Sequence, residues 1–174
     1  HRRMGAAGEA GIRHGQCRVE VGRQRLDVGR RISGEKRRRR DRERRLDAIF
    51  NHTYQFTGLM EPDGTMIEAN DTALRFGGLD REDIVGTPIW KTHWAQTGED
   101  SKQRLREAVE RAAEGEFVRY ERPIQGGDED RIIDFSIRPV TDADGQVELL
   151  IPEARDITEL KRREETLRAA KEEA

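Results

Sequence analysis

The sequence predicts an α+β domain: a five-stranded antiparallel sheet with helices on one face, flanked by an N-terminal helix and a C-terminal exit helix. Two observations predict this fold class. Strand-like runs come in two groups, one before and one after a set of helical segments. The turns that join neighbouring runs are too short for parallel crossovers, so these strands must pair antiparallel.

The N-terminal segment differs from the rest in charge. Residues 1–45 hold 16 Lys+Arg and 6 Asp+Glu, whereas residues 46–174 hold 17 and 29. Residues 1–40 have few large apolar side chains to offset the entropy of ordering, so we expect a disordered basic tail. The run Lys36–Arg40 suggests phosphate contacts with nucleic acid. No aromatic residues interleave for base stacking, however, and a solvated tail is favoured.

Helical segments are predicted from apolar spacing and from end signals. The expected helices lie at Leu46–Phe50, 71–76, 80–85 and 101–114. Asn70 or Asp71 can cap the second of these, and Gly77–Gly78 can end it. The fourth is the longest, with Leu105 and Val109 on one apolar face and charged residues on the other.

Strands are predicted from β-branched and aromatic runs between turn signals. The expected strands are 53–60, 65–69, 116–124, 131–140 and 146–154. In the fourth run Ile133, Phe135 and Ile137 alternate with polar residues. That period of two predicts one buried face and one wet face.

Three local features add specificity to this order of elements. They are Glu61–Gly64 followed by Thr65–Asn70, the segment Asp83–Pro88, and Asp144–Gly145 leading into Arg155–Glu159. With these spacings the chain resembles the PAS family of sensory domains over about residues 42–163, and the last feature is similar to the family's Asp-Ile-Thr signature. The family places the last strand centrally in the sheet. Pro152 in that strand predicts a bulge or an early end of pairing, because proline cannot donate a ladder hydrogen bond.

The resemblance implies a sensory domain at 41–156 and a signalling coiled-coil helix at 157–174. Asp156 is expected to cap this helix, with Thr158 following it and Glu159 at capping-box spacing. In the family this motif relays the signal to a downstream output domain. The alternative is a plain cap on a plain C-terminal helix.

A ligand pocket is expected between the long helix and the sheet. Trp90 and Trp94 are four residues apart and would share a helix face, with His93 between them. The pattern and the family architecture add Phe56, Leu105, Val109, Tyr120, Phe135 and Leu149. Aromatic walls favour a small aromatic or heterocyclic ligand by stacking. The alternative is that these side chains simply fill the core.

The sequence contains few residues or motifs that indicate a cofactor or a catalytic site. A single histidine, His93, is weak support for haem, which we do not expect. Covalent flavin attachment in the light-sensing subgroup needs a cysteine in the helical region, and the only cysteine is Cys17 in the tail. No phosphate loop, serine-nucleophile elbow or paired metal-ligand motif is present. We therefore expect no catalytic residues, no metal site and no enzymatic activity; any kinase activity would belong to residues beyond Ala174.

The expected function is that of a PAS-like sensory module in a multidomain regulator, such as a sensor histidine kinase or a transcriptional regulator. We expect a cytoplasmic homodimer without a membrane span, since no apolar run approaches the roughly 20 residues that a bilayer requires. The alternative is a ligand-free interaction or dimerisation module. Nucleic-acid binding is less favoured because the acidic remainder repels phosphate. That acidic surface suits a halophilic cytoplasm about as well as an ordinary one.

Overall fold

The computed structural model describes residues 14–173, with side chains from residue 33 onward. The chain separates into two compact units, one ending at Asp47 and the other beginning at Ala48. The second unit holds the sheet and its helices, and the site lies within it. Within residues 14–173, no helix combines the length and the apolar character that crossing a membrane requires.

The first unit corrects the expectation of a disordered tail. Helix α1 (His14–Asn51) includes residues 14–40, and the remainder of the predicted tail lies outside the described residues. A scarcity of large apolar side chains shows only that this segment cannot bury a core of its own. A helix needs no core for its hydrogen bonds, and Arg, Lys and Glu have favourable helix propensities. Its side chains from 33 to 49 are exposed, and Arg39 pairs with Glu43 at 2.8 Å.

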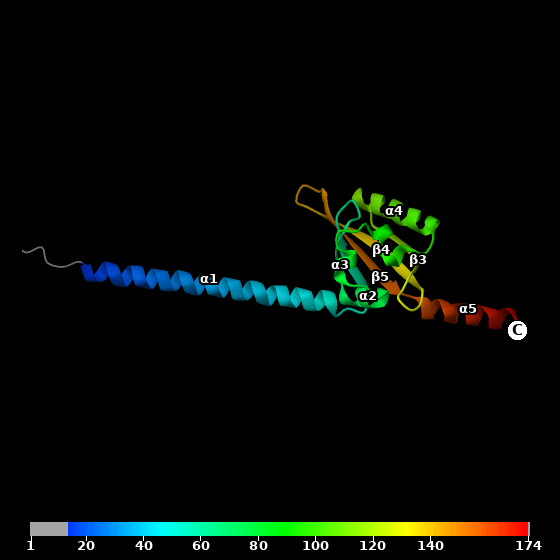
Figure 1. The fold of residues 1–174 in the computed structure, drawn as a ribbon, viewed down its shortest axis with the longest axis horizontal. Helices are drawn as coiled ribbons and strands as arrows, with labels where there is room; N and C mark the ends of the chain where they lie inside the picture. The colour runs from blue at the N-terminus through cyan, green and yellow to red at the C-terminus, as the bar shows by residue number, and fades with distance from the viewer. Residues whose placement is uncertain (1–13, 174) are drawn as a thin grey trace, which may run out of the picture. The chain divides into compact units, whose positions relative to one another are not determined.

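The second unit contains the predicted five-stranded antiparallel sheet, in the order β2-β1-β5-β4-β3 (Figure 1). The strands are β1 (Phe56–Met60), β2 (Met66–Ala69), β3 (Val118–Ile124), β4 (Arg131–Thr141) and β5 (Val147–Asp156). β5 is the central strand, hydrogen-bonded to β1 on one edge and to β4 on the other. The α+β fold class is therefore confirmed.

The helical segments lie close to their expected positions. They are α2 (Asp71–Gly77), α3 (Arg81–Ile84), η1 (Ile89–Lys91), η2 (His93–Ala95), α4 (Glu99–Ala113) and α5 (Thr158–Glu172). The Asn70 side chain caps α2 by accepting a hydrogen bond from the Ala73 amide at 3.1 Å. Gly78 ends the helix in the left-handed conformation, at φ 63°.

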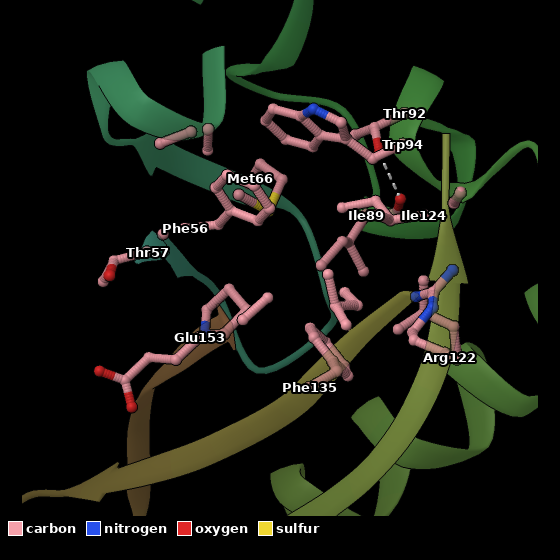
Figure 2. A pocket seen from close by; sticks show the side chains of 18 residues that line it. Phe56, Thr57, Met66, Ile89, Thr92, Trp94, Arg122, Ile124, Phe135 and Glu153 are labelled. Atoms are coloured by element: carbon pink, nitrogen blue, oxygen red, sulfur yellow. Dashed lines mark hydrogen bonds between the residues drawn. The ribbon is translucent and has the colours of Figure 1, made fainter. Parts of the chain in front are cut away.

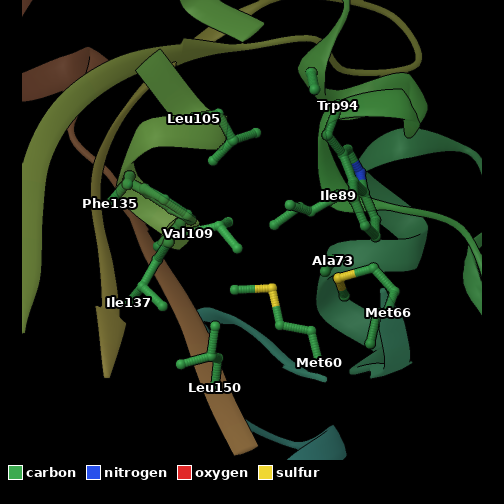
Figure 3. Packing of buried hydrophobic residues seen from close by; sticks show 14 of the residues in the cluster. Met60, Met66, Ala73, Ile89, Trp94, Leu105, Val109, Phe135, Ile137 and Leu150 are labelled. Atoms are coloured by element: carbon green, nitrogen blue, oxygen red, sulfur yellow. The ribbon is translucent and has the colours of Figure 1, made fainter. Parts of the chain in front are cut away.

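The core forms between the inner face of the sheet and α4. Ile133, Phe135 and Ile137 on β4 are buried, as the period of two predicted. Leu105 and Val109 belong to the buried face of α4 and lie close to Phe135 and Ile137 (Figure 3). The inward positions of the sheet and helices meet in one hydrophobic cluster.

The bulge or early end of pairing predicted at Pro152 is wrong. Pro152 pairs with Ile137 on β4 without a register shift. Toward β1 the pairing is interrupted at Pro152 and Ile151, and it resumes in the same register at Leu150. Gly58 on β1 lies beside the Pro152 ring. A Cβ on Gly58 would lie 3.2 Å from Cγ of Pro152 and 2.9 Å from Cε of Met66, so a larger residue at this position would press on both side chains.

Candidate functional site

A cavity of about 60 Å³ lies between the sheet and the helical segments. Four of the residues predicted from the sequence line it: Phe56, Trp94, Leu105 and Phe135. Figure 2 shows Phe56, Trp94 and Phe135 around the space, together with Met66 and Ile89. A cavity that holds benzene measures about 150 Å³, so this space in its present form is too small for the flat aromatic ligand that the sequence suggested.

Trp90 and Trp94 do not share a face, which corrects the prediction. Their segment consists of two 3₁₀ turns separated by Thr92, whose backbone is extended at φ −67° and ψ 159°. Trp94 consequently enters the cavity, whereas Trp90 lines a surface groove that also includes Val109. A Cβ on Gly64 would lie 2.5 Å from the Trp90 ring, so this indole packs directly over the hairpin turn.

Three other predicted residues lie outside the cavity wall. His93 places Nε2 2.9 Å from the carbonyl oxygen of Gly126, which fixes the loop before β4. Tyr120 packs edge-on against Phe135, with ring centroids 5.7 Å apart. Leu149 belongs to the outer face of the sheet, because it is the neighbouring Leu150 that is fully buried. The predicted inward register of β5 was wrong by one residue.

Arg122 on β3 is a cavity residue that the sequence analysis missed. Only 6% of it is exposed, although it is an arginine. A signal for it existed in the predicted strand 116–124. Positions 118, 120, 122 and 124 share one face, and their burial shows that this face points inward.

The guanidinium of Arg122 has few partners. Its Nε donates to the carbonyl oxygen of Pro123 at 3.3 Å, and its carbon Cζ lies 5.5 Å from the centroid of the Phe135 ring. Its Nη2 has no hydrogen-bond partner, and neither has the buried hydroxyl of Tyr120. Burial lowers the pKa of Arg122, and the nearby Tyr120 opposes that shift. Burial likewise raises the pKa of Tyr120.

The exit junction connects the end of β5 to β4 at the start of α5. The Thr158 hydroxyl accepts a hydrogen bond from the Ile132 amide at 2.9 Å, and the Ile157 amide donates to the Ile132 carbonyl oxygen at 2.9 Å. Asp156 accepts from the Thr158 amide at 2.9 Å and from Arg131 at 2.9 Å. The junction therefore ties the first turn of α5 to the strand that carries Phe135.

Two details of the exit differ from expectation. The residue at the helix cap position is Ile157, so Asp156 lies one residue before it and acts on the first helical amide. In a capping box, the Glu159 carboxylate would accept a hydrogen bond from the backbone amide of the cap residue. Here it pairs with Arg163, one turn further along α5. Asp156 and Thr158 are thus at the junction, and Glu159 is on the helix surface.

At the same end of the sheet, where the start of β1 pairs with the end of β5, Asn70 organises the entry to β1. Its side chain is fully buried, and its Nδ2 donates to the carbonyl oxygen of Phe50 at 3.1 Å and to that of Gln55 at 2.9 Å. Its Oδ1 accepts from the amides of Thr57 and Ala73. One side chain therefore links the last turn of α1, the start of β1 and the start of α2.

A known protein family matches most of the second unit. The model described as PAS fold matches residues 50–162. The chain is also similar to the PAS domain of an HTR-like protein from Haloarcula marismortui, with a TM-score of 0.60 and 17% identity, over 72% of this chain and 99% of that one.

Two curated relatives are histidine kinases. Hybrid signal transduction histidine kinase D of Dictyostelium discoideum is 40% identical over 114 residues, which cover 64% of this chain and 7% of that protein. Sensor histidine kinase TmoS of Ectopseudomonas mendocina is 37% identical over 129 residues, which cover 72% of this chain and 13% of that protein. The chain thus spans only a small part of the length of these relatives.

Proposed function

Since this chain belongs to the PAS family, which the sequence resemblance predicted, we propose that it is the ligand-sensing module of a multidomain signal-transduction protein. A PAS domain is a sensory module and not a catalytic one, so the signal must leave the domain to have an effect. The similarity to sensor histidine kinases supports a kinase as the output of the whole protein.

The observation that carries the proposal is the cavity in the core, whose wall lies on the strand pair that leads to the exit junction. Arg122 in the cavity wall pairs with Ile133 on β4, and the next pair along the two strands is Pro123 with Ile132. Ile132 is the residue of β4 that forms hydrogen bonds with Ile157 and Thr158 at the exit junction. A ligand that changes the separation of β3 and β4 would therefore act on the first turn of α5. It would shift the output only by its differential affinity for two states of the junction.

A homodimer is the form in which we expect the module to act. Leu160 and Leu167 on α5 are 54% and 64% exposed, and they are one heptad apart. A 15-residue helix is marginal alone and gains stability when such a stripe packs on a second helix. This stripe also supports the second candidate function, a ligand-free dimerisation module.

Native mass spectrometry distinguishes the two functions. We expect the purified chain to be a dimer that retains one small molecule per subunit, which is absent from the denatured mass. The matched variant Ala154→Leu adds three carbons at the cavity wall and should remain a dimer without the retained mass. A bare wild-type dimer would favour the interaction module over the sensor.

A further inference from the structure

The first half of the β3–β4 loop, residues 125–127, is bonded to the helical segment that carries Trp94. The Gln125 amide donates to the Trp94 carbonyl oxygen at 3.1 Å. Nε2 of His93 lies 2.9 Å from the Gly126 carbonyl oxygen, and since a carbonyl oxygen only accepts, this nitrogen carries the proton. Trp94 lines the cavity, so these two bonds join the loop to the cavity wall.

The same half of the loop also contacts α2. The Gly127 amide donates to the Phe76 carbonyl oxygen at 2.9 Å. A Cβ on Gly126 would lie 2.8 Å from Cζ of Phe76, so the loop packs directly on that ring. Phe76 in turn stacks on Phe56, a residue of the cavity wall, with ring centroids 4.9 Å apart. The position of the loop therefore depends on a second aromatic residue of the wall, through Phe76.

The second half of the loop contacts the exit helix. Glu129 pairs with Arg131 at the start of β4 and, at 3.9 Å, with Arg162 on α5. Arg131 also donates at 2.9 Å to Asp156, the residue that accepts from the first helical amide of α5. Figure 1 shows the loop, in yellow, beside the start of α5. Each pair is partly exposed and weak alone, but the pairs share residues and so form one network.

The two halves of the loop are too close together to move independently. Only Asp128 separates Gly127, which is bonded to α2, from Glu129, which is paired toward α5. Because consecutive Cα atoms stay about 3.8 Å apart, a displacement of Gly127 leaves little slack before Glu129 also moves. The loop thus provides a connection from the cavity wall to α5 that is separate from the pairing of β3 with β4.

We propose that the β3–β4 loop is a strap that couples the Trp94 side of the cavity to the start of α5. The proposal rests on the sensing function proposed above and adds a second route for its signal. A ligand that displaces Trp94 would move the loop through Gln125 and would loosen the charge network that holds α5. His93 is then a positioning residue that anchors the strap, in place of the ligand contact that the sequence suggested.

Hydrogen exchange of the full chain, measured by mass spectrometry, tests the anchor at His93. His93→Leu removes the bond to Gly126 and should raise amide exchange at the start of α5, residues 158–163, by about threefold or more. His93→Gln can still donate to the same carbonyl oxygen, so its exchange should return toward that of the wild type. An equal rise in the buried part of α4, residues 105–112, would indicate a general loss of stability and would overturn the proposal.

Glu129→Gln tests the other end of the strap at an exposed site. It should raise the exchange of residues 158–163 by about twofold or more. Once this end is released, adding His93→Leu should give no further increase, because the two changes interrupt one connection. Asp128→Asn is the matched control, one residue earlier and equally exposed, and it should exchange as the wild type does.

The outcomes separate the strap from the sensing function. Unchanged exchange of residues 158–163 in either single variant, or additive increases in the double variant, would overturn the strap. If native mass spectrometry then still shows a retained molecule, the domain remains a sensor that signals through the sheet. Raised exchange together with a bare protein in native mass spectrometry would overturn the sensing function and keep the loop as a mechanical connection.

Discussion

Asp156 shows how a single side chain can influence the exit of the domain. It accepts hydrogen bonds from Thr158 and Arg131, so it touches both the start of α5 and the start of β4. Burial alone would raise its pKa, but these hydrogen bonds and the Arg131 cation outweigh burial, and the pKa lies below its ordinary value of 3.8. The carboxylate is therefore more favourable in the folded state than in the unfolded chain.

This pKa shift predicts how Asp156→Asn changes acid stability. A lowered pKa in the folded state stabilises it at every pH above the ordinary value, and this contribution is lost as the pH falls through the lowered pKa. Between about pH 5 and pH 2 the free energy of unfolding should fall less steeply in Asp156→Asn than in the wild type. Urea unfolding at a series of pH values measures this.

Asp128→Asn is the matched control, since Asp128 is an exposed aspartate in the loop before β4. It should follow the wild-type profile. Coincident profiles for Asp156→Asn and the wild type would show that the contacts of Asp156 contribute no net stability.

At the scale of elements, the β1–β2 hairpin depends on a glycine for two separate reasons. Gly64 has φ 88°, and its missing Cβ is the space that the Trp90 ring occupies. Gly145, in the β4–β5 turn, has φ 82° but open space around the same position. Substituting each glycine by alanine therefore distinguishes two destabilising effects. Both substitutions strain the backbone at positive φ, but only the one at Gly64 also displaces the Trp90 indole.

We predict that Gly64→Ala lowers the free energy of unfolding by about 2–4 kcal/mol, whereas Gly145→Ala lowers it by about 1–2 kcal/mol. Chemical denaturation followed by Trp fluorescence measures both, and only Gly64→Ala should change the emission of the folded state. Equal losses in the two variants would mean that the Trp90 ring moves aside without cost.

The elements were predictable from the sequence where one local rule decides the structure. The Gly64 turn, the Asn70 cap and the alternation around Phe135 each follow from a residue type at a fixed spacing. The inward positions of β5 were not, because Leu149, Leu150 and Ile151 are equally apolar and only pairing with β4 selects Leu150. Arg122 was missed for the same reason. Its burial follows from the register of β3, which places position 122 on the inward face, and residue type alone does not reveal that register.

For the whole molecule, the uneven charge has a consequence for stability. Residues 48–174, the second unit, hold 28 Asp+Glu against 17 Lys+Arg, so the folded unit repels itself at low ionic strength. We predict that its melting temperature rises as NaCl increases from about 0.1 M, where the Debye length is about 10 Å, to about 1 M, where it is about 3 Å. Differential scanning fluorimetry measures the rise.

Removing charge should weaken this salt dependence. Glu110→Gln and Glu114→Gln together neutralise two exposed acids at the end of α4. The double variant should be more stable than the wild type in low salt and closer to it in high salt. A melting temperature independent of salt would argue against the halophilic hypothesis and favour an ordinary acidic surface.

The central position of β5 restricts how the domain can move its exit helix. β5 is bonded along both edges, so sliding it would break the ladders to β1 and β4 together. The hydrogen bonds of Ile132 hold the first turn of α5 against the neighbouring strand. Both the Ile157 amide and the Thr158 hydroxyl are bonded to Ile132, so α5 cannot turn at its first residue without a matching movement of β4. A receiving helix would therefore report the position of the start of β4.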